Sequence, residues 1–226
     1  MVDLNKVLDY SLIGQAPSVP AAAQAKIDAH IIVDHNDWGD SFSKDFISEV
    51  KKYYTRKQAR RCAYCRSIIN YDGYAEAVEH LTARQNKPHW MFVLHNLTVS
   101  CTGCNSSKGT KNMLRNGINT YGHTPANCPT GTVEYLCFNP HIDRWSDHFE
   151  VEDGFMLITK RNTKGPFTYK ELNMKRYNVI LDYIDQLQFR LKNDSFKILN
   201  KRIRKEKNPE ILAALKKAID TIEQTI

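Results

Sequence analysis

Cys62-Ala63-Tyr64-Cys65 and Cys101-Thr102-Gly103-Cys104 are two C-x-x-C pairs, and the stretch that they enclose decides the fold of this chain. Four thiolates suit a closed tetrahedral zinc site, which leaves no coordination position open for catalysis. Such a zinc ion contributes directly to the free energy of folding. The alternative, four unrelated buried cysteines, leaves the repeated spacing unexplained. The sequence therefore predicts a structural zinc site formed by Cys62, Cys65, Cys101 and Cys104.

Residues 66–100, between the two pairs, carry two further segments of interest. In Ala77-Val78-Glu79-His80-Leu81-Thr82, the alternation of apolar and polar residues predicts a short strand that ends near His80. The segment His95-Asn96-Leu97-Thr98-Val99-Ser100 leads as a second strand into the second cysteine pair. A helix is expected over about residues 104–114, because Gly109 weakens a helix without forbidding it. The predicted order is strand, loop, strand and helix, held at both ends by zinc.

This order of residues resembles the HNH endonuclease superfamily. The pattern of that family is C-x-x-C, an acidic residue before His, Asn-Leu, then C-x-x-C-Asn and a Lys. The combination is specific, although each piece alone is weak. It covers roughly residues 58–115 and implies an α+β fold around a small ββα-metal core. The matching residues are Cys62, Cys65, Glu79, His80, Asn96, Leu97, Cys101, Cys104, Asn105 and Lys108.

The resemblance also implies a role for each residue of this core. His80 would be the general base that deprotonates the attacking water, since a neutral imidazole near pH 7 suits that task. Glu79 and Asn105 would hold one Mg²⁺ or Mn²⁺ through oxygen atoms, and that ion would contact the scissile phosphate. Asn96 would hold the loop and orient His80 by hydrogen bonding. Lys108 would contact a phosphate of the substrate.

Two departures from the family pattern and one extra histidine bear on these roles. Glu79 stands where the family often has Asp, and its additional methylene changes the reach of the carboxylate. Asn105 stands where the third signature position is often His, and its amide oxygen is still able to bind a metal ion. His95, directly before Asn96, is a further candidate for contacting the substrate, although a histidine beside a site is more often structural.

Charge and composition narrow the choice of partners. The chain has a formal net charge of +7 and a pI near 9.0, and a basic protein favours polyanions because Lys and Arg displace counterions from phosphates. Charge alone is weak evidence, and it is the HNH resemblance that implies a nucleic-acid substrate, with DNA favoured over RNA. No apolar stretch approaches the roughly 20 residues that span a bilayer, and the N-terminus lacks the pattern of a secretory signal. A cytoplasmic protein with no membrane association is therefore expected.

The rest of the chain is expected to surround the core. The predicted regions are a helical part over 1–57, the nuclease core over 58–115, loops and a hairpin over 116–169, and a helical part over 170–226. The predicted elements are a helix over 41–60 capped by Ser43, a strand at Val133–Phe138, a hairpin around Asp153-Gly154, and helices after Lys170 and from Asn208-Pro209. The apolar stripes of the C-terminal helices allow a homodimer without requiring one. Cys128 and Cys137 have no matching pair and are expected to be free thiols.

A second resemblance reaches beyond the core. Phe138-Asn139-Pro140, Asp147-His148-Phe149 and Glu171-Leu172-Asn173 are similar to segments of the HNH subunits of Septu-type and retron-associated anti-phage systems. In those systems the nuclease works beside an ABC/SMC-like ATPase. The resemblance implies such an ATPase partner, docked on the N-terminal part or on the C-terminal helices. The alternative is that these segments simply cover the nuclease core.

Two classes of function follow from these patterns. The leading interpretation is a metal-dependent HNH endonuclease that acts as the effector nuclease of an anti-phage system. The rival is a non-catalytic zinc-ribbon module that binds nucleic acid. A binding module does not need the Glu-His doublet, the Asn-Leu pair or the Asn that follows the last cysteine, and their presence favours the enzyme. The sequence carries no phosphate-binding P-loop, so ATP hydrolysis by this chain itself is not expected.

Overall fold

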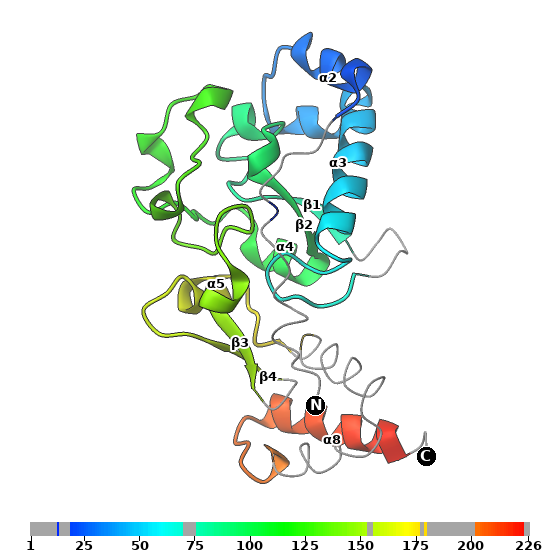
Figure 1. Cartoon of the computed structure of the whole chain (residues 1–226), viewed down its shortest axis with the longest axis vertical. Coiled ribbons are helices and arrows are strands. Elements are labelled where there is room, and N and C mark those ends of the chain that lie inside the picture. Colours follow the sequence, from blue (N-terminus) through cyan, green and yellow to red (C-terminus); the bar gives the residue numbers. More distant parts are fainter. Residues whose placement is uncertain are drawn as a thin grey trace.

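The structure is a computed structural model that describes residue 13 and residues 19–69, 76–152, 156–176, 179 and 202–223 (Figure 1). Within these ranges the chain combines helices with two separate two-stranded antiparallel sheets, so the α+β class is confirmed. Among the described residues, none forms part of a helix that is both long and apolar enough to cross a bilayer.

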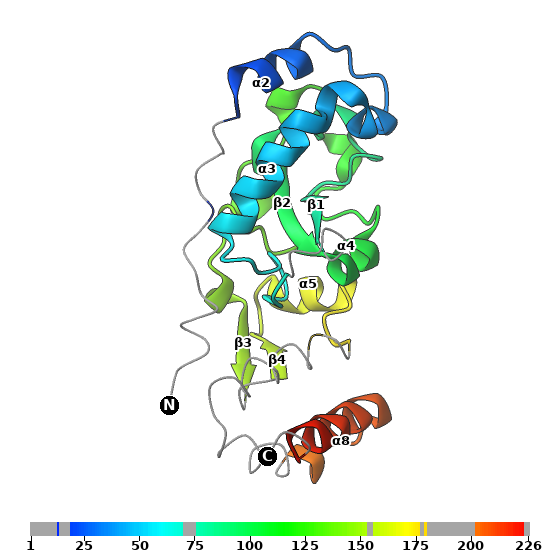
Figure 2. The same cartoon turned by 90° about the vertical axis from the view of Figure 1, so that its right-hand side faces the viewer.

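The segment between the cysteine pairs folds as two strands followed by a helix. Strands β1 (Glu76–His80) and β2 (Leu97–Cys101) pair antiparallel, and α4 (Thr102–Lys108) follows β2 directly. The helix packs against both strands (Figure 2). It ends at Gly109, whose φ of 51° lies in the left-handed region that favours glycine. The expectation that this helix reaches residue 114 is therefore wrong.

Helix α3 (Lys44–Lys57) covers this sheet and lies beside β2 in both views (Figures 1 and 2). Its apolar residues Phe46, Val50 and Tyr54 recur at helical spacing, and all three are fully buried. The predicted helix is confirmed with shorter bounds. The predicted cap is wrong, because the Ser43 hydroxyl donates to two preceding backbone carbonyls and makes no capping hydrogen bond.

The residue after α3 attaches the helix to the sheet. Gln58 is fully buried, and its amide nitrogen donates to the carbonyl oxygens of Val99 (2.7 Å) and Arg61 (2.8 Å). Its amide oxygen accepts from the backbone nitrogen of Val99 (3.0 Å) and from the hydroxyl of Thr98 (2.7 Å). The Gln58 side chain therefore forms hydrogen bonds with the Val99 backbone groups at the outer edge of β2. Buried backbone groups require such partners.

Short 3₁₀ helices occupy much of the remaining chain, and helix α2 (Ala21–Asp28) precedes them. They are η1 (His35–Gly39), η2 (Ser41–Ser43), η3 (Pro88–Trp90), η4 (Leu94–Asn96), η5 (Ile118–Thr120), η6 (Pro125–Asn127), η7 (Thr132–Glu134) and η8 (Trp145–Asp147). The strand predicted at Val133–Phe138 is wrong, because η7 begins that segment and Tyr135 forms an isolated bridge instead of a ladder. The Glu134 carboxylate accepts from the backbone nitrogen of Gly131 (2.8 Å), a local bond that stabilises a turn.

A hairpin and a short helix follow. Strands β3 (Phe149–Glu152) and β4 (Met156–Thr159) pair antiparallel, which confirms the predicted hairpin, while its tip lies outside the described residues. Helix α5 (Gly165–Glu171) lies in a region where loops were expected. A Cβ atom at Gly165 would lie 2.2 Å from the carbonyl oxygen of His148, so this close approach requires a glycine.

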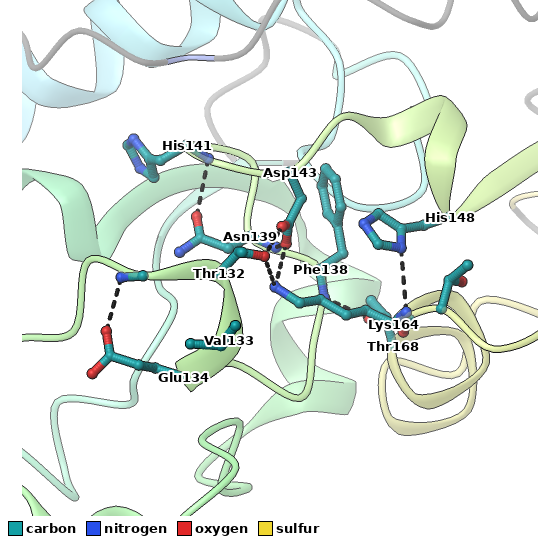
Figure 3. Close-up of polar contacts among 12 residues, drawn as sticks. Thr132, Val133, Glu134, Phe138, Asn139, His141, Asp143, His148, Lys164 and Thr168 are labelled. Atoms are coloured by element: carbon teal, nitrogen blue, oxygen red, sulfur yellow. Dashed lines mark hydrogen bonds and ion pairs between the residues drawn. The ribbon is translucent and has the colours of Figure 1, made fainter.

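A buried ion pair holds the loop before this hairpin against the start of α5 (Figure 3). The Lys164 ammonium donates to Asp143 (2.6 Å) and to the hydroxyl of Thr132 (2.8 Å), and that hydroxyl donates to the same carboxylate. Asp143 also accepts from the backbone nitrogen of Asn139 (2.8 Å). The Lys164 backbone nitrogen donates to the ring of His148 (3.2 Å). Each polar group of this Asp143–Lys164 cluster is satisfied, which favours one rigid arrangement.

The loop held by this cluster reaches back to the central unit. The ring of His141 donates from Nε2 to the carbonyl oxygen of Leu97 (2.7 Å), at the first residue of β2. The indole of Trp145 donates to the carbonyl oxygen of Tyr64 (2.8 Å), inside the first cysteine pair. The strand-strand-helix unit is thus braced from residues well beyond it in the sequence.

The last described helix is α8 (Pro209–Glu223). The side-chain oxygen of Asn208 accepts from the backbone nitrogens of Glu210 (3.0 Å) and Ile211 (3.4 Å), which confirms the predicted cap. Ile211 and Leu215 of its apolar stripe are buried. The helix predicted after Lys170 falls mainly outside the described residues.

Candidate active site and metal centre

The four cysteines of the C-x-x-C pairs converge at one point. Their Sγ atoms all lie within 4.8 Å of one another, and three of the four residues are fully buried. Tetrahedral zinc with bonds of about 2.3 Å places its sulfurs roughly 3.8 Å apart. The Cys65 and Cys101 sulfurs lie 3.8 Å apart. The cluster therefore fits a zinc ion, as the spacing predicts. Among the described residues, these four cysteines are the one group of His, Cys, Asp or Glu side chains close enough to hold a metal ion.

The surroundings of Cys101 favour its thiolate, whereas burial raises the pKa of Cys62 and of Cys104. The backbone nitrogen of Cys104 points to the sulfur of Cys101 at 3.5 Å, at the start of α4. Hydrogen bonds from the neighbouring thiols, Cys104 first, and the positive charge of Arg176 lower the pKa of Cys101. A lowered pKa favours the form that binds metal.

A groove lies where β1, α4 and the N-terminal part meet. Its volume is about 520 Å³. Three of the residues expected to carry chemistry, Glu79, His80 and Asn105, line this groove together with Lys108. Lys51 and Arg84 add positive charge to this groove, and Trp38 adds an aromatic ring.

His80 ends β1 and is held in a defined tautomer. Its Nε2 lies 3.1 Å from the carbonyl oxygen of Met91. A carbonyl can only accept, so Nε2 carries the proton and Nδ1 keeps a lone pair. Within the described residues Nδ1 makes no hydrogen bond. Burial, with the charges of Lys108 and Arg84, lowers the pKa of His80 to about 3, so the ring is neutral near pH 7. Its free nitrogen in the groove has the position that a general base needs, whereas the lowered pKa makes it a weak proton acceptor.

The N-terminal part of the chain supplies one wall around this histidine. The Trp38 ring lies edge-on to the His80 ring, with centroids 4.4 Å apart, and stacks on Phe92 at 5.4 Å. Trp38 is placed by η1, and Arg84 attaches that turn to the core by donating to the carbonyl oxygen of His35 (2.8 Å). These contacts limit the rotation of the His80 ring.

Glu79 and Lys108 form a buried ion pair. Lys108 Nζ lies 2.7 Å from Glu79 Oε1, and the side chains are 2% and 3% exposed. Burial raises the pKa of Glu79, and the charge of Lys108 acts in the opposite direction. The sequence predicts that Lys108 contacts a phosphate of the substrate. The structure instead places the Lys108 ammonium against the Glu79 carboxylate, inside the protein.

Asn105 faces the groove from α4 and is partly exposed. Its side-chain amide makes no hydrogen bond within the part of the chain that the structure describes. Mg²⁺ and Mn²⁺ prefer carboxylate and amide oxygens, which are the groups that Glu79 and Asn105 bring to the same groove. Each residue could offer one oxygen to a hard divalent cation, although Lys108 already balances the charge of Glu79.

Asn96 supports the loop between the two strands. It is fully buried, and its amide oxygen accepts from the backbone nitrogen of Thr82 (2.8 Å). Its amide nitrogen donates to the carbonyl oxygens of Thr82 and Trp90, both at 3.1 Å. Trp90 directly precedes Met91, whose carbonyl accepts from His80. Asn96 therefore holds the loop, and its effect on His80 passes through the backbone instead of a direct hydrogen bond.

His95 is not brought to the groove. It lines a separate cavity of about 420 Å³ together with His141, and its Nε2 lies 3.4 Å from the carbonyl oxygen of Cys128. Cys128 and Cys137 are buried and outside any disulfide, and burial raises the pKa of each thiol to about 12. These two thiols are therefore protonated and unreactive near neutral pH.

Sequence reasoning missed the groove residues that come from outside the central segment. Trp38 reaches the groove from η1, and no motif marks it. Arg84 lies in the strand-to-strand loop, where a basic residue is unremarkable. The approach of Arg176 to the cysteine cluster also has no local signal, because 75 residues separate it from Cys101.

Comparison with known proteins gives one distant relative to report. No protein-family model matches the chain. The chain is 26% identical over 162 residues to the Septu protein PtuB of Bacillus thuringiensis, an alignment that covers 71% of this chain. The match spans 52% of that relative, or about half of its length. The chain is therefore a distant homologue of a Septu protein.

Proposed function

We propose that this chain is an HNH-type endonuclease that hydrolyses phosphodiester bonds in nucleic acid. The observation that carries the proposal is the arrangement of His80 in the groove. Its Nε2 is committed to the Met91 carbonyl, while its free Nδ1 shares the groove with Glu79 and Asn105. A base and two oxygen ligands in one groove are what metal-assisted hydrolysis needs.

We infer the following reaction from these positions. Nδ1 of His80 takes a proton from a water molecule, whose oxygen attacks phosphorus as the bond to the leaving 3′ oxygen breaks. That oxygen takes a proton from solvent, which leaves a 3′-hydroxyl and a 5′-phosphate. Glu79 and Asn105 would hold Mg²⁺ or Mn²⁺, which would supply Lewis-acid chemistry that stabilises the developing negative charge. Trp38 keeps the imidazole oriented.

DNA is the proposed substrate, and RNA is the second choice. Lys51 and Arg84 bring positive charge to the groove beside His80. Such charges neutralise phosphates without selecting a base, so they favour backbone binding and leave sequence preference to other parts.

The distant relationship to a Septu protein supports a role in anti-phage defence. In such a system we propose that the chain works as the nuclease beside an ABC/SMC-like ATPase. The resemblance of segments outside the core to Septu-type subunits points the same way. Co-purification of the chain with an ABC/SMC-like ATPase of such a system tests this part, and a clean separation of the two proteins would count against it.

A second candidate function is a non-catalytic module that binds nucleic acid. The buried Glu79–Lys108 pair favours it, because Lys108 already neutralises the carboxylate that the metal would need. The two candidates differ in one respect that is easy to measure: the module binds nucleic acid and leaves it intact.

The test is a cleavage assay on plasmid DNA, single-stranded DNA and tRNA, with Mg²⁺, Mn²⁺ or EDTA. We expect wild type to cut with a metal ion and His80→Ala to lose cutting while it keeps zinc and its circular dichroism spectrum. His95→Ala is the matched control, since that histidine lies in the separate cavity and should leave cutting intact. Binding without cleavage, also after addition of the ATPase, would favour the binding module.

A further inference from the structure

A side chain from outside the core lies on the thiolate cluster. Nη2 of Arg176 donates to the sulfurs of Cys101 (2.9 Å), Cys104 (3.3 Å) and Cys65 (3.8 Å). One guanidinium nitrogen therefore faces three of the four residues that fit zinc. Arg176 follows α5, in the part of the chain that the sequence assigned to a separate helical region.

The other terminal nitrogen ties the guanidinium to the segment from which it comes. Nη1 donates to the carbonyl oxygens of Leu172 and Asn173, both at 3.2 Å. Leu172 and Met174 are buried, so this segment is packed in place. The rigid planar fork of an arginine suits this double attachment, which a lysine cannot reproduce. Arg176 thus joins the end of α5 to the sulfurs.

The opposite side of the contact is built to admit the arginine. A Cβ atom at Gly103, inside α4, would lie 2.5 Å from Nε and 2.8 Å from Cζ of Arg176. Glycine within a helix is less favourable than alanine. The Arg176 guanidinium lies against Gly103, and this close contact explains why a glycine stands between Cys101 and Cys104.

Charge gives this contact a role. Zinc held by four thiolates carries a net double negative charge, and a buried charge without a partner is costly. Groups that donate hydrogen bonds to metal ligands strengthen metal binding. We propose that Arg176 is the counter-charge of the zinc centre, and that it makes retention of the metal and docking of residues 172–176 depend on each other.

The dependence works in both directions. If bound zinc favours the docked arginine, the docked arginine favours bound zinc by the same free energy. Loss of the metal then removes an attachment between the core and the chain that continues toward α8. The zinc centre thereby has a second role beyond closing the two cysteine turns, independent of whether the groove cuts nucleic acid.

The test measures how fast zinc leaves the full-length protein for the chromogenic chelator 4-(2-pyridylazo)resorcinol. We expect Arg176→Met to lose zinc about 10-fold faster than wild type, the lower end of the effect of outer-shell partners. Lys175→Met is the matched control, since it removes an exposed positive charge one residue away and should release zinc at the wild-type rate. Trypsin cleavage after Arg176 should also accelerate when zinc is removed.

Gly103→Ala moves the arginine without removing it. In wild type it should speed zinc loss, because the added methyl displaces the guanidinium. In the Arg176→Met background it should leave the rate unchanged or slow it, since alanine stabilises the helix. Release of zinc from Arg176→Met at the wild-type rate would overturn the proposal. An equal effect of Gly103→Ala on the rate of zinc release in both backgrounds would also overturn it. If Arg176→Met does not fold, the same comparison in Arg176→Lys decides, with a reduced effect of Gly103→Ala expected there.

Discussion

Lys108 Nζ lies 2.7 Å from Oε1 of Glu79, and both side chains are almost completely removed from solvent. The pair joins the last turn of α4 to β1 beside His80. Because neither residue has another ion-pair partner among the described residues, we expect the two to act as a unit. Loss of one should therefore cost more than loss of both.

Lys108→Met should leave the Glu79 carboxylate buried and uncompensated. We expect the free energy of unfolding to fall by about 3–5 kcal/mol. Glu79→Gln combined with Lys108→Met should cost less than the sum of the single changes, by about 1–3 kcal/mol. Urea denaturation of the four proteins measures this coupling. Strict additivity would show that the pair is not a unit, and an unchanged stability in Lys108→Met would place Lys108 in solvent, ready to contact phosphate.

Removal of one zinc ligand should unfold the core. A structural zinc contributes on the order of 10 kcal/mol, which is comparable with the whole stability of a domain. We therefore expect Cys101→Ser to lose zinc and cooperative unfolding, by elemental analysis and circular dichroism. Cys128→Ser is the matched control, because that thiol lies outside the cluster. Retention of zinc and fold in Cys101→Ser would contradict the structural role of the site.

Trp38 should affect the rate of cleavage through His80. If it orients the imidazole, Trp38→Ala should lower kcat by about 10- to 100-fold, the range expected for small misplacements of a catalytic group. Trp38→Phe keeps an aromatic ring against His80 and should retain most of kcat. Steady-state kinetics on the preferred substrate distinguishes positioning of His80 from direct contact with the substrate. A rise of KM at constant kcat would mean that Trp38 contacts the substrate instead of positioning His80.

Stability should fall in mild acid because of His141. Burial lowers the pKa of His141 to about 4, and its ordinary value is 6.5. Between these values the unfolded chain binds a proton that the folded chain excludes, so stability is complete above pH 6.5 and is lost as the pH falls toward 4. The contribution of His141 at pH 5 is a loss of about 2 kcal/mol.

His141→Gln should reduce this pH dependence, because glutamine can still donate to the Leu97 carbonyl and does not titrate. Denaturant unfolding at pH 7.5 and pH 5.0 compares the variant with wild type. Equal losses of stability in the two proteins would assign the acid sensitivity to other groups. The other buried histidines remain in both proteins, so their contributions cancel in the difference.

Local patterns made much of the fold predictable. The cysteine spacing predicted a cluster whose sulfurs the structure brings together, and alternation predicted the strand that ends at His80. The cap at Asn208 depends on bonds to residues two and three positions ahead, so the sequence alone contains it. The strand expected at Val133–Phe138 was wrong, because the Glu134 carboxylate accepts from Gly131 and favours a turn.

What could not be predicted depends on contacts between distant residues. In the sequence, Gln58 is an ordinary polar residue near the end of a predicted helix. In the structure it is buried and binds both backbone groups of Val99. Lys108 stands at a position that suggests contact with substrate, and its burial against Glu79 is visible only in three dimensions. Trp38 reaches His80 from an N-terminal turn that no motif marks.

The bracing of β2 by His141 has a consequence for synthesis on the ribosome. The residues that carry the candidate chemistry emerge early, whereas His141 and the Asp143–Lys164 cluster that holds its loop emerge later. Until then the Leu97 carbonyl has no donor, and the Tyr64 carbonyl waits for Trp145. A nascent chain that ends near residue 115 therefore contains every motif residue and every residue that lines the groove, but not the contacts that brace β2. The motif is complete well before the folding unit, so the braced conformation of β2 is reached only after the hairpin and α5 have left the ribosome.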